Sequence, residues 1–336
     1  MIQPTSNRAP AGYVRWTLWV LGPVAILLSS LWISRWAHSE PAEPPAANHV
    51  VVRGQDPGSG RSPPLAEKST AAQEALAAEC RQAADALIAK LGDDCQVIVH
   101  APWIVAGDLS RAELEGRYTK TVSPAQRAMA HAYFRTPPDR PITLLLFSRE
   151  RAYNHYRKEL FGETGISVYG YFKPQERTLV MNIGTGTGTL VHEMTHALVS
   201  FDFPTVPDWF NEGLASLHEA SQIRRDESGL DGLTNWRLPG LQKAVREKRL
   251  GSLYDLATET NFRGEQVGLN YAQARYFCLF MQQRGVLTRF YRRFRERWEW
   301  DPQGTDAVLA MFPGANWEQL DREFQQWVLG LEWKRN

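Results

Sequence analysis

The chain has 336 residues, of which 43 % are apolar, and its 38 basic and 37 acidic side chains leave a net charge of +1. This length and composition allow one sizeable hydrophobic core with further segments around it. A near-neutral chain gives no electrostatic reason to expect a nucleic-acid partner. The three cysteines form no CxxC pair, which argues against a cysteine-based zinc knuckle.

The N-terminal residues 1–36 are expected to form a transmembrane signal anchor. Residues 16–33 are uncharged and apolar over a length close to the minimum for a membrane-spanning helix. Two arginines precede this stretch, and one arginine and then two acidic residues follow it, which favours a cytoplasmic N-terminus. A cleaved signal peptide is the alternative, because residues 37–39 loosely fit a cleavage site. Both interpretations place the rest of the chain outside the cytoplasm, and the anchor predicts a single-pass protein of the cell (inner) membrane.

A segment rich in Pro, Ala, Gly and Ser follows over residues 37–70, and we expect it to be a flexible linker. The globular domain is therefore predicted over residues 71–336. If this domain lies outside the cytoplasm, Cys80 and Cys95 could form a disulfide bond and leave Cys278 free. The alternative is three reduced, buried thiols.

The globular part shows strand patterns mainly in its first half and helix patterns throughout. A helix from residue 190 to 200 carries the motif described below. Early strands followed by late helices predict an α+β fold: a small mixed sheet with helices in an N-terminal lobe, and a mostly helical C-terminal lobe. The predicted strands cover residues 96–106 (interrupted by Pro102), 141–147, 168–172 and 178–183; the other predicted helices cover residues 71–91, 110–134, 149–161, 238–248, 252–258, 271–283, 287–300 and 317–329.

Residues 192–196 read His-Glu-Met-Thr-His, an HExxH motif within an apolar run. Residues four apart share one face of a helix, so His192 and His196 can bind the same metal ion. Glu193 is offset by about 100° around the helix and can approach a metal-bound water without being a ligand. This pattern is typical of a zinc site at which the glutamate takes a proton from the water as it attacks a carbonyl.

A catalytic zinc ion takes three protein ligands and keeps one position open. Glu212 follows His196 by 16 residues. Pro204 and Pro207 should end the first helix and let the chain reverse. A second helix starting near Asp208, which is suited to cap it, would bring Glu212 beside the two histidines.

The HEMTH sequence at residues 192–196, followed by WFNEGLA at residues 209–215, resembles the gluzincin peptidases, such as aminopeptidase N and thermolysin. In these enzymes an Asn-Glu pair on a second helix supplies the third metal ligand. The chain is more closely similar to bacterial peptidase MA-like proteins, over roughly residues 95–330. The resemblance implies a Zn²⁺ cofactor held by His192, His196 and Glu212, with Glu193 as the catalytic base. The matching segments are residues 169–171, 178–183, 184–188, 192–196, 209–213 and 271–273.

Some positions depart from the family pattern or extend it. Ser216 replaces an acidic residue that orients a histidine in the thermolysin-like pattern, so we expect Asp208 or a backbone carbonyl to take that role. The Gly-x-Met-Glu-Asn stretch of aminopeptidases is absent, and aminopeptidase specificity is therefore not implied. Tyr271 is a candidate catalytic residue that would donate a hydrogen bond to an oxyanion, unless it only packs in the core. The strand over residues 178–183 is a candidate sheet edge for a peptide substrate, and the alternative is an ordinary internal strand.

Two functions fit these features. The first is a membrane-anchored, zinc-dependent metallopeptidase that hydrolyses peptide bonds of a peptide or protein substrate outside the cytoplasm. The second is a catalytically inactive, zinc-binding envelope or scaffold module with a peptidase fold, which the serine at position 216 motivates.

Overall fold

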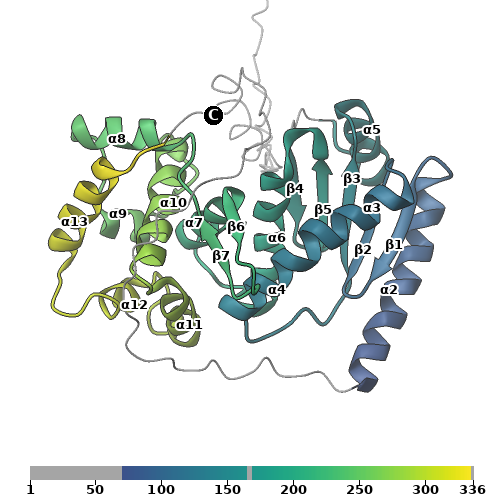
Figure 1. Ribbon diagram of the computed structural model, residues 1–336, viewed down its shortest axis with the longest axis horizontal. Coiled ribbons are helices and arrows are strands. Elements are labelled where there is room, and N and C mark those ends of the chain that lie inside the picture. The colour runs from purple at the N-terminus through teal and green to yellow at the C-terminus, as the bar shows by residue number, and fades with distance from the viewer. Residues whose placement is uncertain (1–69, 165–168, 334–336) are drawn as a thin grey trace, which may run out of the picture.

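The computed structural model describes residues 70–164 and 169–333 (Figure 1). The predicted anchor over residues 1–36 and nearly all of the predicted linker lie outside these residues. Within the described part of the chain, no helix combines the length and the apolar character needed to cross a bilayer.

The fold is a mixed α and β structure, as the sequence predicts. One half contains a small mixed sheet with helices, and the other half is mostly helical (Figure 1). The strands are β1 (Gln96–His100), β2 (Trp103–Gly107), β3 (Ile142–Phe147), β4 (Gly170–Lys173), β5 (Thr178–Asn182), β6 (Ser221–Ile223) and β7 (Leu230–Gly232). The α-helices are α2 (Thr70–Leu91), α3 (Arg111–Arg117), α4 (Ser123–Ala132), α5 (Glu150–Phe161), α6 (Thr187–Asp202), α7 (Asp208–Glu219), α8 (Leu238–Arg246), α9 (Leu253–Thr258), α10 (Val267–Gln283), α11 (Leu287–Arg297), α12 (Thr305–Leu309) and α13 (Trp317–Gly330).

The main sheet has the strand order β1-β2-β3-β5-β4. Strands β2, β3 and β5 run parallel, whereas β1 and β4 pair antiparallel at the two edges. The single interrupted strand predicted over residues 96–106 is wrong, because the chain reverses at Ala101-Pro102 and pairs His100 with Trp103. The prediction of an edge strand over residues 178–183 is also wrong. The chain turns back after β4, so β5 is internal and β4 forms the edge.

Alternating side chains bury both faces of the sheet. Leu144, Leu146 and Leu179 contribute to the large core shared with α4, α6 and the helical half. Leu145 and Val180 point to the other face, where they pack with residues of α5 and the end of α2. This period of two is the pattern expected for a strand buried on both sides.

The helical half is built around the packing of α10 against α7. Gly213 of α7 permits the close approach, since a Cβ atom there would lie 2.9 Å from the carbonyl oxygen of Ala274 in α10. Most predicted helices are confirmed within a few residues. The helix predicted over residues 110–134 does begin with a capping box at Ser110, but a π-helical turn at Tyr118–Val122 divides it. The short β6–β7 pair and α12 were not predicted.

The three cysteines are free and buried. Cys80 of α2 lies in a core cluster with Ile104 of β2, whereas Cys95 belongs to a different core cluster with Tyr153 and Tyr156. The structure therefore contains no bond between Cys80 and Cys95 and agrees with the alternative of three reduced thiols.

Candidate metal centre

The candidate centre lies where α6 and α7 pack together, between the sheet half and the helical half (Figure 1). The turn after β5 leads into α6 through Gly186, whose φ of +101° favours glycine. The glycine-rich segment thus forms a sharp turn into the helix. After α6 the chain reverses at residues 203–207, and α7 begins at Asp208 as predicted.

Three ligand atoms converge between these helices. The Nε2 atoms of His192 and His196 are 3.1 Å apart, and each lies 3.5 Å from Oε2 of Glu212. Donor atoms placed tetrahedrally around zinc at their usual bond lengths are about 3.3–3.5 Å from one another. The spacing thus matches that of a single tetrahedral ion, and the His192–His196–Glu212 group could hold a metal ion.

Glu212 has an unusual environment for a carboxylate. Its side chain is only 3 % exposed, and Oε2 has no hydrogen-bond partner among the described residues. Burial opposes ionisation, but the charges of His196 and His192 hold the pKa of this carboxyl well below its usual value. A buried, unsatisfied carboxylate oxygen is costly, and a cation between it and the imidazoles would remove that cost.

His196 is oriented by the residue that precedes the third ligand. Its Nδ1 atom donates to Oδ1 of Asn211 at 2.9 Å, which leaves the Nε2 lone pair free for a metal. The predicted roles of Asp208 are both wrong. Pro207 takes the N-cap position of α7, so Asp208 falls in the first turn without a capping bond and instead faces Arg263 at 3.6 Å. Ser216 does not replace the missing acid, because its buried Oγ has no partner among the described residues.

Glu193 lies beside the ligands and next to the sheet edge. Burial raises the pKa of its carboxyl, and the charge of Glu212 raises it further. Attraction to His192 and His196 and a backbone hydrogen bond with Phe172 of β4 offset only part of this rise. A carboxyl whose pKa moves toward neutrality is suited to accept and return a proton.

Tyr271, in the first turns of α10, reaches the same centre. Its hydroxyl accepts a hydrogen bond of 3.0 Å from Nη1 of Arg263, and its ring packs on Phe262 with centroids 5.3 Å apart. Burial, followed by the charge of Glu212, raises the pKa of the phenol far above its usual value. The hydroxyl therefore stays protonated and remains a potential donor, although its ring also packs as a core residue does.

Two residues of this site were not assigned from the sequence. Asn211 was noted only as part of the Asn-Glu pair, and its contact with His196 follows from the helix-to-helix geometry. Arg263 donates through Nη2 to Oε1 of Glu212 from 51 positions further along the chain, and no local pattern signals it.

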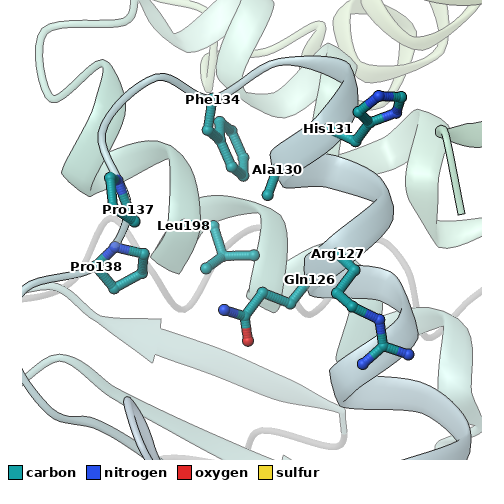
Figure 2. A pocket seen from close by; sticks show the side chains of 8 residues that line it. All are labelled: Gln126, Arg127, Ala130, His131, Phe134, Pro137, Pro138 and Leu198. Carbon is teal, nitrogen blue, oxygen red and sulfur yellow. The ribbon is translucent and has the colours of Figure 1, made fainter. Parts of the chain in front are cut away.

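A separate pocket of about 260 Å³ is lined by residues of α4, of the segment that follows it and of α6 (Figure 2). Leu198 of α6 and Phe134 contribute apolar side chains to it. Two polar side chains that line it have partners: Gln126 accepts from the indole N–H of Trp103, and Arg127 pairs with Glu227. This pocket contains no group of metal ligands and is distinct from the centre between α6 and α7.

No protein-family model matches the chain, and a search of curated proteins finds no significant match. The geometry of the centre therefore carries the functional argument.

Proposed function

We propose that this protein is a zinc-dependent metallopeptidase of the gluzincin type, similar to the bacterial peptidase MA-like proteins. The observation that carries the proposal is the convergence of three ligand atoms at 3.1–3.5 Å around a buried carboxylate oxygen that has no other partner. The sheet half and the helical half would correspond to the two lobes of a gluzincin, with α6 as the active-site helix.

The ligand set favours zinc. Two imidazole nitrogens and one carboxylate oxygen are the set used by catalytic zinc in thermolysin-like enzymes, whereas magnesium and calcium prefer oxygen ligands alone. Among the described residues, His192, His196 and Glu212 are the group that meets this requirement. A set of three protein ligands leaves a fourth position for substrate or water.

A zinc ion bound there would polarise a peptide carbonyl and acidify a water molecule. Glu193 would accept the proton of the attacking water and return it to the leaving amine, for which its raised pKa suits it. The protonated hydroxyl of Tyr271 would donate a hydrogen bond to the developing oxyanion.

The substrate is proposed to be a peptide or protein that adds to β4. Within the described residues, this edge strand pairs only with β5, so its other side has no strand partner there and could pair with an extended chain. The backbone hydrogen bond between Glu193 and Phe172 puts the proposed base beside that edge. With the predicted N-terminal anchor, cleavage would take place at the membrane, outside the cytoplasm.

A catalytically inactive zinc-binding scaffold is the second candidate. The buried Ser216, which orients neither histidine, is the observation that favours it. The two candidates share the metal site and differ in whether Glu193 transfers a proton during catalysis.

The substitution Glu193→Gln distinguishes them. In the full-length protein it should preserve zinc content and reduce cleavage of a peptide library by on the order of 10²–10⁴-fold, the usual contribution of a general base. Glu318→Gln, a change at an exposed ion pair on α13, is the matched control and should cleave normally. Wild-type protein that binds zinc but cleaves nothing would favour the scaffold. Undiminished cleavage by Glu193→Gln would exclude the proposed mechanism.

A further inference from the structure

Arg263 makes three contacts that converge on the metal centre. It lies in the loop between α9 and α10, and its side chain is 47 % exposed. Nη2 donates to Oε1 of Glu212, Nη1 donates to the Tyr271 hydroxyl at 3.0 Å, and Nε lies 3.6 Å from Oδ2 of Asp208. One guanidinium thus links a metal ligand, a candidate catalytic residue and an acidic residue at the start of α7.

These contacts divide the two oxygens of Glu212 between different partners. Oε1 is hydrogen-bonded to Arg263, whereas Oε2 faces the two histidines and has no hydrogen bond among the described residues. We propose that Arg263 is a positioning residue that makes Glu212 a single-oxygen metal ligand and holds the Tyr271 hydroxyl over the same centre. The inference rests on the proposed metal centre and does not depend on catalysis.

A guanidinium is required for this role because it is planar and carries donors in a fixed fork. Adjacent N–H groups can reach Glu212 and Tyr271 at the same time and set the angle between them. A lysine ammonium would supply the charge without this geometry. Lysine at position 263 should therefore compensate only in part for the loss of the arginine.

Without Arg263, Oε1 of Glu212 would lose its donor in a buried site. The carboxylate could then rotate so that both oxygens approach the ion, which would change a four-coordinate site into a five-coordinate one. Groups that orient metal ligands in this way typically affect metal affinity by 10–100-fold.

The loop that carries Arg263 is fixed by the core. The neighbouring Phe262 is 2 % exposed, and its carbonyl accepts a hydrogen bond of 2.9 Å from the side chain of Asn270 in α10. The N–H of Gly264 bonds the carbonyl of Asn261, also at 2.9 Å. Because the backbone on both sides of Arg263 is anchored, the half-exposed side chain can be replaced without removing core contacts.

The test measures metal binding to the full-length protein and needs no substrate. Zinc affinity is determined by competition with a chromophoric chelator for wild type, Arg263→Gln, Arg263→Lys and the control Arg322→Gln, which breaks an exposed ion pair on α13. We expect Arg263→Gln to bind zinc about 10–100-fold more weakly than wild type. Arg263→Lys should bind zinc more weakly than wild type but more tightly than Arg263→Gln, and the control should bind zinc normally. The visible absorption of bound Co²⁺ should weaken in Arg263→Gln, because a four-coordinate site would become five-coordinate.

Wild-type zinc affinity and an unchanged Co²⁺ spectrum in a folded Arg263→Gln protein would overturn the proposal. Weaker zinc binding with an unchanged spectrum would also overturn it, since Glu212 would then have kept its mode of binding. Thermal unfolding of the metal-free proteins shows whether Arg263→Gln is folded, and Arg263→Lys supplies the test if it is not. A wild-type protein that binds zinc but cleaves no peptide would refute the proposed peptidase function and leave this inference intact.

Discussion

Two buried carboxylates on neighbouring helices differ in how their charge is compensated. Asp202, at the end of α6, has hydrogen bonds to both oxygens. Glu212, in α7, has one oxygen paired with Arg263 and the other directed at His192 and His196 without a hydrogen bond in the described structure. A buried carboxylate whose oxygens are both hydrogen-bonded stabilises a single folded structure. A buried carboxylate oxygen without a hydrogen bond indicates a binding site for a cation or another ligand.

Both carboxylate oxygens of Asp202 already accept hydrogen bonds from the protein. Its side chain connects α6 to the loop after α4 and to α11, so it joins segments that are far apart in the sequence. The donors are the backbone N–H groups of Arg135 and Thr136, both at 2.7 Å, the Tyr291 hydroxyl at 3.0 Å and Nη1 of Arg295 at 2.6 Å. We infer that Asp202 acts in folding and Glu212 in binding.

The largest expected effect on stability follows from removing the charge of Asp202. Asp202→Asn leaves Arg295, whose side chain is 12 % exposed, with only the exposed Glu296 as an ionic partner, and it should lower the free energy of unfolding by about 3–5 kcal/mol. Urea denaturation of the metal-free protein measures this change. Glu212→Gln, in the same assay, should cost clearly less, because its partner Arg263 is about half exposed. Equal destabilisation by the two substitutions would remove the distinction between the two carboxylates.

A smaller change in free energy, measured as zinc affinity, is expected from substituting Asn211, which orients His196. Asn211→Leu removes the acceptor for Nδ1 and should weaken zinc binding by about 10–100-fold. Asn211→Asp keeps an acceptor at the same place and should bind zinc with an affinity close to wild type. If Asn211→Leu and Asn211→Asp bind zinc equally well, the hydrogen bond does not set the orientation of His196.

The convergence of His192, His196 and Glu212 at the candidate metal centre could be predicted because local rules determine it. Helical spacing places His192 and His196 on one face, and two prolines between the helices allow the reversal that brings Glu212 to them. The α+β class was also predictable, since helical and strand periodicities are properties of single segments. The start of α7 near Asp208 was also predicted from the prolines that precede it.

Other features depend on contacts between distant segments. The edge position of β4 follows from the strand order of the sheet, which periodicity does not specify. The contact of Arg263 with Glu212 depends on how α10 and its preceding loop pack against α7. Asp208 was assigned to a cap because of its residue type, although the preceding Pro207 occupies that position.

Zinc content tests the central claim most directly. Full-length wild type and Glu212→Gln, purified in parallel with the control Glu318→Gln, are equilibrated with zinc, freed of excess metal and analysed for metal and protein. We expect about one zinc ion per chain in wild type and in the control, and little or none in Glu212→Gln. Equal zinc in wild type and Glu212→Gln would remove Glu212 from the metal centre and contradict the proposed site.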